Sequence, residues 1–185
     1  MSKVKCSVFI AMSLDGYIAR EDGSIDWLMK TNELVPKDED GGYQAFISTV
    51  DTIVMGRYSF EKVVTFDPWP YLSPVIVLSQ HDINIPHALQ NTVSLSAEDP
   101  VALVERLSTQ GIKHLYIDGG ITIQRFLIAG LIDEMIITVI PVLLGAGRHL
   151  FGSLPSDIEL QLLETQAIGR GLVQMRYQVG SWNNA

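Results

Sequence analysis

The sequence predicts an α/β fold with three layers, in which helices cover both faces of a mixed sheet that is mostly parallel and ends in an antiparallel hairpin. Two patterns carry this prediction. Short apolar segments alternate with helical segments over residues 4–144, as is typical of βαβ units. Residues 159–166 and 172–179 then alternate in polarity on either side of Gly169-Arg170-Gly171, which predicts the hairpin. Because no linker or repeat interrupts the chain, we expect one domain over residues 1–185.

The predicted parallel strands are short runs of apolar and β-branched residues, the usual length of buried strands. They are expected over Val4–Met12, Thr52–Met55, Val75–Leu78, Val93–Leu95, His114–Ile117 and Met135–Leu144. Pro141 should mark the end or an edge of the last strand, because proline cannot donate to a strand ladder.

Three helices longer than a few turns are predicted from apolar residues at helical spacing. They are expected over Asp38–Val50, Glu98–Gln110 and Ile121–Ala129. In the last of these, Ile121, Arg125 and Ile128 share one face, with Phe126 and Leu127 beside it. Gly130 is a natural stop for this helix.

A polar segment with two glycines, Ser13–Asp26, follows the first strand. We interpret it as a flap with a short extended piece over Tyr17–Ala19, although an ordinary surface hairpin is an alternative. Gly145-Ala146-Gly147 looks like the start of a dinucleotide-binding glycine fingerprint, but it leaves a strand without opening a helix, which that motif requires. We therefore expect it to be a loop that folds over the site from the edge of the sheet.

Glycine stands between strand and helix at two places. Gly119-Gly120 precedes the helix Ile121–Ala129. The first N–H groups of a helix are unpaired and its dipole is positive there, so this junction can bind phosphate, and the bare glycine backbone admits a diphosphate. The alternative is a tight turn that binds nothing.

The second junction starts at Gly56 and carries Arg57 and Ser59. A planar guanidinium beside a hydroxyl and free N–H groups suits a phosphate monoester, although Arg57 could also be a solvated surface charge. Ligands of such folds bind at the carboxyl ends of parallel strands. Small or polar residues stand at four of these predicted ends: Met12, Gly56, Ser79 and Gly119.

Composition and charge narrow the class of protein. A chain of 185 residues that is 47% hydrophobic, with no apolar run of the ~20 residues that a membrane span needs, is expected to be globular. A net charge of −8 without a basic patch argues against nucleic acid as a partner. The single cysteine, Cys6, suits the reducing cytoplasm, and four scattered histidines predict no metal site.

Together these motifs resemble the dihydrofolate reductase-like superfamily, and more narrowly the C-terminal reductase domain of the bacterial riboflavin-biosynthesis deaminase/reductase and its stand-alone relatives. The matching pieces span nearly the whole chain in the right order. They are SLDGYIA (13–19) with Trp27, DTIVMGR (51–57), VLS (77–79), DGG (118–120), GLIDE (130–134), Pro141 and LGAG (144–147).

The resemblance implies an NADPH-dependent reductase and assigns a residue set to each part of the cofactor. The 2′-phosphate is expected to bind to Gly56, Arg57 and Ser59, with Leu78 and Ser79 on the adenine side. The diphosphate is expected to bind to Gly119, Gly120, Ile121 and Thr122, with a cis peptide bond between the two glycines. The nicotinamide is expected against Ala11, Ile18 and Trp27.

Hydride transfer also needs a proton donor near the acceptor atom. By resemblance, Asp40 lies near the position of the buried acid of dihydrofolate reductase, and Asp118 matches an acidic residue that contacts substrate in the riboflavin reductase. Asp15, Asp26 and Phe46 are further expected substrate contacts. For each acid, the alternative is a helix cap or a turn former.

Two functions stay open on the sequence. One is an enzyme that reduces a pyrimidine, of the 5-amino-6-(5-phosphoribosylamino)uracil reductase type, or a dihydrofolate or pterin. The other is a non-catalytic NADPH-binding or regulatory domain on the same scaffold. Arg20, Lys30 and Lys37 are the cations near enough to bind a ribose phosphate. The apolar strand with Ile136, Ile137 and Val139, expected near the sheet edge, predicts a homodimer.

Overall fold

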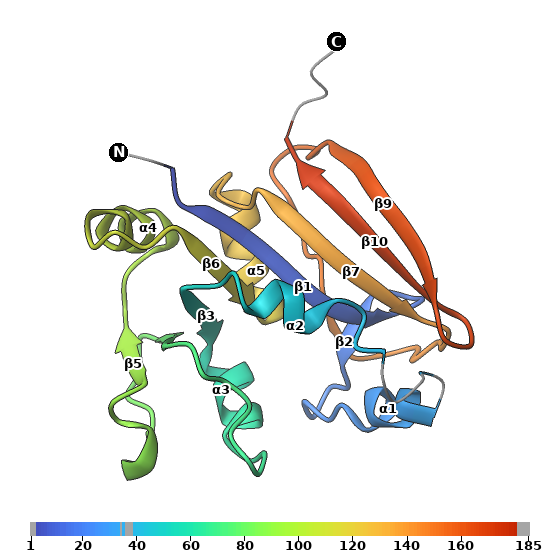
Figure 1. The fold of residues 1–185 in the computed structure, drawn as a ribbon, viewed down its shortest axis with the longest axis horizontal. Coiled ribbons are helices and arrows are strands. Elements are labelled where there is room, and N and C mark those ends of the chain that lie inside the picture. The colour runs from blue at the N-terminus through green and yellow to red at the C-terminus, as the bar shows by residue number, and fades with distance from the viewer. Residues whose placement is uncertain (1–2, 34, 36–38, 181–185) are drawn as a thin grey trace.

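The computed structural model describes residues 3–33, 35 and 39–180, and its centre is one eight-stranded sheet (Figure 1). The strand order is β5-β4-β3-β6-β1-β7-β10-β9, and only the pairs β7–β10 and β10–β9 are antiparallel. The strands are β1 (Lys5–Ser13), β3 (Thr52–Gly56), β4 (Val75–Leu78), β5 (Val93–Ser96), β6 (His114–Asp118), β7 (Glu134–Ile140), β9 (Leu160–Ile168) and β10 (Leu172–Val179). This is the predicted mixed sheet with its C-terminal hairpin.

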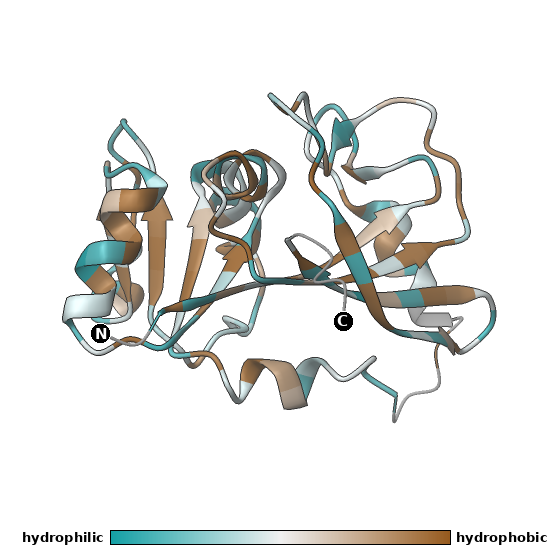
Figure 2. Cartoon of the chain, turned by 90° about the horizontal axis from the view of Figure 1, so that it is seen from above, coloured by the Kyte–Doolittle hydropathy of each residue, from teal (hydrophilic) through white to brown (hydrophobic). Residues whose placement is uncertain are grey.

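Helices cover both faces of the sheet. The helices are α1 (Asp26–Met29), α2 (Tyr43–Ile47), α3 (Arg57–Val63), α4 (Pro100–Thr109) and α5 (Gly120–Ile128), with short 3₁₀ turns at Lys30–Glu33 and His87–Leu89. Residues of α4 and α5 belong to one apolar core, and residues of α2 and α3 belong to the core on the opposite face. Figure 2 shows apolar residues concentrated in the strands and in the helical segments beside them. In the described part of the chain, no helix is long and apolar enough to cross a membrane.

The parallel strands are close to their predicted positions because their composition leaves little choice. Their β-branched and apolar residues are buried on both faces, as the zero exposure of Ile53 and Val54 on β3 shows. β4 has the predicted bounds, and β7 ends at Ile140, directly before Pro141. The predicted end of that strand at Leu144 is therefore wrong, because Pro141 has no N–H with which to continue the ladder.

The first long helix is much shorter than the predicted Asp38–Val50. α2 begins only at Tyr43, because Gly41 and Gly42 adopt positive φ angles of 61° and 82°, which a helix cannot contain. Asp38 lies outside the described residues. The predicted apolar face is confirmed in part, since Phe46 packs against Phe9 of the sheet.

The predicted face of α5 is also wrong. Ile121 and Ile128 are 64% and 53% exposed, and the residues buried against the sheet are Thr122, Ile123, Phe126 and Leu127. The helix turns its more continuous apolar stripe inwards, so its two outer isoleucines remain in contact with solvent.

The flap is tied to a distant part of the chain. Its extended piece, β2 (Tyr17–Ala19), has the predicted bounds and pairs antiparallel with β8 (Arg148–His149) in a separate two-stranded sheet. It is therefore not an ordinary surface hairpin. Gly147 lies so close to Ala19 that a side chain there would collide with the Ala19 carbonyl. The segment 145–147 is thus a loop that meets the flap.

β7 lies inside the sheet, between β1 and β10. Ile136, Ile137 and Val139 therefore cannot pair two subunits at a sheet edge, and that part of the dimer prediction is wrong. The two edges are β5 and β9.

Candidate functional site

The two glycine junctions lie side by side. β3 and β6 are neighbouring parallel strands in which Met55 is opposite Asp118, so Gly56 and Gly119 leave the sheet at the same edge. A Cβ atom built on Gly56 would lie 2.8 Å from Oγ1 of Thr122, and one built on Gly119 would collide with Oγ of Ser59. The hydroxyl of each helix therefore points at the glycine of the other junction.

α5 begins without a capping side chain. Its N-cap is Gly119, whose φ of 86° requires glycine, and no side chain accepts a hydrogen bond from the first turn. The N–H groups of that turn can therefore receive an anion. The predicted cis bond between Gly119 and Gly120 is not observed, since within the described chain the cis peptide is Asp67–Pro68. The chain turns here through the positive φ angle of Gly119 instead.

The residues expected around the adenosine differ in their freedom to bind a ligand. Arg57 is partly exposed and has one long ion pair, with 3.7 Å between its Nε and Oε1 of Glu61. Leu78, in contrast, is only 7% exposed and belongs to the core. The hydroxyl of Ser79 already donates to the carbonyl of His81, at 2.7 Å.

The residues expected around the nicotinamide form two groups. Ala11 packs against a small core cluster that contains Trp27, which is 4% exposed. The indole Nε1–H of Trp27 is buried and has no acceptor among the described residues. Ile18 lies apart from them, over the start of α5, where its Cδ1 would be 3.0 Å from a Cβ on Gly120.

Asp118 ends β6 immediately before the glycine junction, and three tyrosines lie near enough to interact with its charge. Burial raises the pKa of Asp118 to about 6, despite the hydrogen bond from the N–H of Gly119. The pKa values of Tyr43, Tyr71 and Tyr116 are also raised, first by burial and then by the charge of Asp118. The carboxyl group of Asp118 is therefore partly buried and can hold a proton near neutral pH.

The other three predicted acids have structural partners. Asp40 accepts from the N–H groups of Gly42 and Gln44, at 2.8 Å each, which lowers its pKa. It acts as a cap in front of α2 and lies on the surface. This is the alternative role that the sequence left open.

The flap acids hold the flap together. Asp15 accepts from the hydroxyl of Ser13 and from the N–H groups of Leu144 and Gly145, and these bonds lower its pKa to about 2. Asp26 is held by Arg20, with 2.6 Å between Nε and Oδ1, and this bond lowers its pKa. Neither carboxylate is free to bind a substrate in this arrangement.

Phe46 lies in the wall of a cavity of about 430 Å³ between α2 and the sheet. Its ring contacts Phe9, His114 and Tyr116, and it is only 8% exposed. The cavity extends from Gly41 and Gly42 along the sheet surface and does not reach Asp118. Phe46 is thus mainly a core residue whose ring forms part of the cavity wall.

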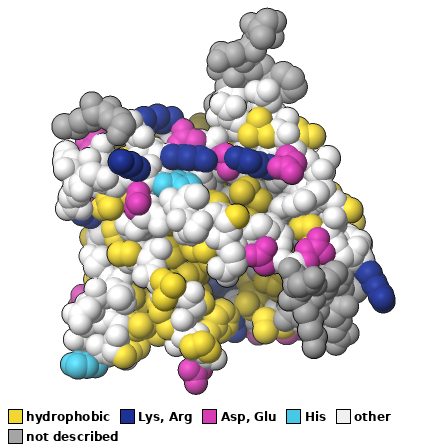
Figure 3. Space-filling model, viewed as in Figure 1, with side chains coloured by type: hydrophobic (Ala, Val, Ile, Leu, Met, Phe, Trp, Pro, Cys, Tyr) yellow, Lys and Arg dark blue, Asp and Glu magenta, His cyan; other side chains and the backbone are white. Residues whose placement is uncertain are grey.

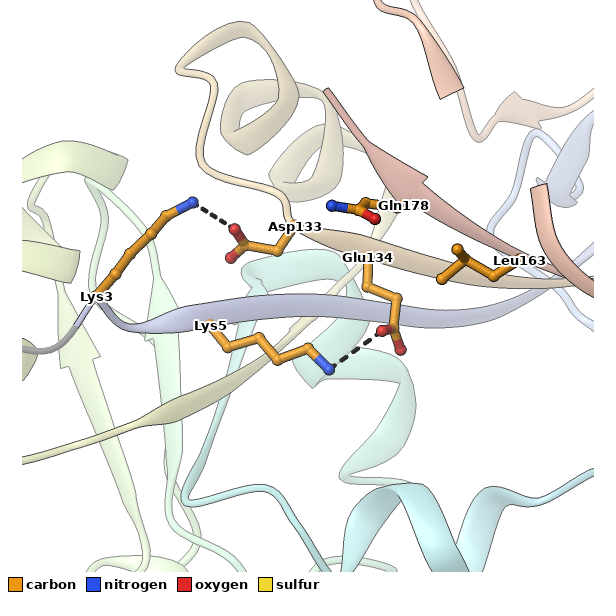
Figure 4. Close-up of a pocket in the computed structure, with 6 residues that line it drawn as sticks. All are labelled: Lys3, Lys5, Asp133, Glu134, Leu163 and Gln178. Atoms are coloured by element: carbon orange, nitrogen blue, oxygen red, sulfur yellow. Dashed lines mark hydrogen bonds and ion pairs between the residues drawn. The ribbon is translucent and has the colours of Figure 1, made fainter. Parts of the chain in front are cut away.

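A second cavity, of about 290 Å³, lies at the opposite, amino ends of β1 and β7 (Figure 4). Its charges are paired, because Lys3 binds Asp133 and Lys5 binds Glu134. Figure 3 shows basic and acidic side chains close together along the upper edge of the visible face, with apolar side chains gathered in its lower half. Among the described residues, no cluster of His, Cys, Asp or Glu is arranged to hold a metal ion.

Three residues beside the junctions were not predicted. Tyr58 is 53% exposed, and the guanidinium carbon atoms of Arg57 and Arg148 each lie 4.9 Å from the centre of its ring. The carbonyl of His149 lies 2.9 Å from a Cβ position on Gly120. Arg148 and His149 lie beside the site because β8 pairs with β2 and because Gln124 of α5 donates to the carbonyl of His149, contacts that no local pattern in the sequence signals.

The chain matches proteins of the same length. It is 38% identical over 176 residues to the uncharacterised protein YwjB of Bacillus subtilis (strain 168), an alignment that covers 94% of this chain and 97% of YwjB. It is 41% identical to a protein of Shewanella sp. PV-4 that is provisionally assigned to riboflavin biosynthesis, whose crystal structure superposes with a TM-score of 0.89 over 96% of this chain and all of that one.

A more distant solved structure shows the same fold. RibD of Acinetobacter baumannii superposes with a TM-score of 0.69 at 18% identity, over 96% of this chain and 58% of that protein. Residues 4–174 match the family described as the RibD C-terminal domain. The fold and the resemblance to reductase domains of riboflavin biosynthesis are confirmed, and this chain belongs to the RibD C-terminal domain family.

Proposed function

We propose that this protein is an NADPH-dependent reductase that transfers a hydride to a small heterocyclic substrate in the cytoplasm. The candidate substrates are 5-amino-6-(5-phosphoribosylamino)uracil, dihydrofolate and other pterins. One observation carries the proposal: two glycine-led helix starts meet at one edge of the sheet, directly beside an acid with a raised pKa. Membership of the RibD C-terminal domain family supports the same chemistry.

The residues at the edge fit a dinucleotide. The uncapped first turn of α5, with Gly119 and Gly120, would receive the diphosphate. Arg57, with Ser59 nearby, would receive the 2′-phosphate that distinguishes NADPH from NADH. When bound, NADPH supplies the hydride, and the protein's task is to orient it and exclude water.

Asp118 would supply the proton. Because its pKa is raised to about 6, a substantial fraction of Asp118 is protonated in mildly acidic to neutral solution, as a general acid requires. Tyr43 and Tyr71 are partly exposed and near enough to interact with the charge of Asp118, so they offer aromatic rings to a flat substrate.

Of the three cations expected to bind the phosphate of a ribosyl substrate, only Lys30 is described and without an ion pair among the described residues, and it is a single exposed lysine in the 3₁₀ turn Lys30–Glu33. Arg20, one of the expected cations, is already paired with Asp26. Lys37 lies outside the described residues. Unphosphorylated pterins therefore belong in the test beside the pyrimidine.

The decisive experiment measures NADPH oxidation with each candidate substrate in turn. Turnover with one of them, lost in Asp118→Asn while NADPH still binds, is the expected result. Tight NADPH binding without turnover on any substrate would instead favour a non-catalytic NADPH-binding domain. Failure to bind NADPH at all would refute the proposal.

A further inference from the structure

We propose that Arg148 is a third part of the cofactor site, beside the two glycine junctions. Its guanidinium would bind the diphosphate from the side of the flap. The proposal rests on the proposed function and assigns a role to a residue that neither the sequence motifs nor the glycine junctions include. Four observations support it: the position of Arg148, its neighbouring side chains, its unused hydrogen-bond donors and the acidic net charge of the chain.

The position of Arg148 is fixed by backbone pairing. It lies in β8, opposite Ala19 of β2, and the next residue, His149, places its carbonyl against Gly120 at the start of α5. The backbone beside Arg148 is therefore packed on the junction that would hold the diphosphate. This position does not depend on a flexible side chain.

The guanidinium of Arg148 reaches the other junction. Its Cζ lies 4.9 Å from the ring centre of Tyr58, in the first turn of α3, and the Cζ of Arg57 lies at the same distance from that ring. Two positive groups thus share one half-exposed ring beside Gly56. Both guanidinium groups are therefore available to an anion that binds beside this ring.

The donors of Arg148 are largely unused. Its Nε and Nη2 both donate to the carbonyl of Glu21, at 3.3 Å each, and the guanidinium lies against Gly23. Among the described residues it forms no ion pair, although the chain has 21 acidic residues against 13 lysines and arginines. Arg125 and Arg170 also lack an ion pair among the described residues, but they are exposed and lie outside both junctions. Arg148 lies beside the junctions, so its charge is available there to an anionic ligand.

Because the diphosphate is common to both nicotinamide cofactors, Arg148 should not discriminate between them. Arg148→Gln should weaken adenosine 5′-diphosphate, NADH and NADPH each by about tenfold, the effect of losing one charge-assisted hydrogen bond. It should also reduce the salt dependence of binding, because one charge pair is lost. Arg57→Gln, in contrast, should weaken NADPH alone.

The test is isothermal titration of the full chain with the three ligands and with adenosine at two salt concentrations. Arg148→Lys should restore part of the affinity, because it keeps the charge. Arg125→Gln is the matched control, since Arg125 is exposed on α5 and outside both junctions, and it should bind like the unaltered protein. Adenosine has no phosphate, so its binding should not change in any variant.

Two results would overturn the proposal while leaving the proposed function intact. In the first, Arg148→Gln binds adenosine 5′-diphosphate normally and loses affinity only for the complete dinucleotides. In that case Arg148 does not bind the diphosphate and only holds the flap against α3. In the second, the affinity of Arg148→Gln for all three phosphorylated ligands is unchanged, and Arg148 has no part in the site. If the unaltered chain binds neither NADPH nor NADH, the proposed function itself fails, and this inference fails with it.

Discussion

Asp118 is set apart from the other predicted acids by its surroundings. Asp15 and Asp40 accept several hydrogen bonds near the surface, and their pKa values are lowered. Asp118 has a single backbone donor, and burial raises its pKa to about 6. Residue type alone could not separate these aspartates, because the difference comes from burial, which the fold decides.

The activity should therefore follow the protonation of Asp118. For the turnover substrate, kcat/KM should be constant below about pH 6 and fall as the pH rises beyond it, because the general acid is then lost. Asp118→Asn should lower kcat/KM about 100-fold or more while NADPH affinity changes little. A pH profile in which Asp118→Asn keeps the same falling limb would assign that limb to another group.

The buried carboxylate of Asp118 should also lower the free energy of unfolding at neutral pH. Its folded pKa of about 6 lies above the ordinary 3.8, so the folded state binds more protons between these values and stability falls as the pH rises through them. Asp118→Asn should raise the free energy of unfolding at pH 7–8 by about 1–3 kcal/mol, and the gain should vanish below about pH 4. Thermal melts across this pH range measure it, and a loss of stability at pH 8 would contradict the burial argument.

Arg57 should distinguish the two cofactors. Arg57→Gln should weaken NADPH about 10–100-fold, because a charge-assisted contact to the 2′-phosphate is lost, and should leave NADH nearly unchanged. Isothermal titration with both cofactors measures the ratio. Equal weakening of the two would contradict the role given to Arg57 and would move it to the shared diphosphate.

At the scale of elements, Gly120 couples α5 to the flap. Its backbone does not need glycine for conformation, but a Cβ there would lie 2.9 Å from the carbonyl of His149 and 3.0 Å from Cδ1 of Ile18. Gly120→Ala should therefore push β2 and β8 away and cost about 1–3 kcal/mol of stability, as overpacking does. Thermal melts and limited proteolysis of the flap would show it.

The control for Gly120→Ala is Ile128→Ala on the same helix. Ile128 is 53% exposed, so its truncation should change the melting temperature little and leave the flap as resistant as in the unaltered protein. If Gly120→Ala melts and is cleaved like this control, the flap is not seated on Gly120, and the position of Arg148 loses its support.

The elements that the sequence predicts well are those whose composition decides their structure. β4 is a run of four buried aliphatic residues, and β2, β4 and β10 have the predicted bounds. The helices are harder to predict because glycine conformation and tertiary contact set their ends and faces. Gly41 and Gly42 stop α2 from starting at Asp38, and α5 turns Ile121 outwards because Ile123 and Phe126 fill the core better.

For the whole molecule, the site is predictable as far as it depends on local junctions. Gly56 and Gly119 could be placed at one edge from the order of parallel strands alone, and β3 and β6 are indeed neighbours. Arg148, Tyr43 and Tyr71 could not, because contacts between segments distant in sequence bring them near the site. Tyr43, for example, reaches Asp118 from a helix 75 residues earlier in the chain.

The exposed edge of the sheet also bears on assembly, and here we propose a homodimer through the C-terminal hairpin. β9 is an edge strand at the side of the molecule (Figure 1), and eight consecutive residues of it, 160–167, are at least partly exposed. Leu162, Leu163 and Val173 are 50%, 46% and 40% exposed. Within β9 only Glu164 is charged and there is no proline, so the usual protection of an edge strand is weak.

A second copy of the chain would cover this edge, either by pairing with β9 or by packing on the face that Leu162 shares with its partner Tyr177. Light scattering after gel filtration at micromolar concentration should give twice the chain mass of 20.5 kDa. Leu162→Glu should give a monomer that still folds, because the side chain is half-exposed. Leu72→Glu, at a fully exposed leucine outside the hairpin, should stay dimeric. A monomeric mass for the unaltered chain would show that β9 remains uncovered in solution.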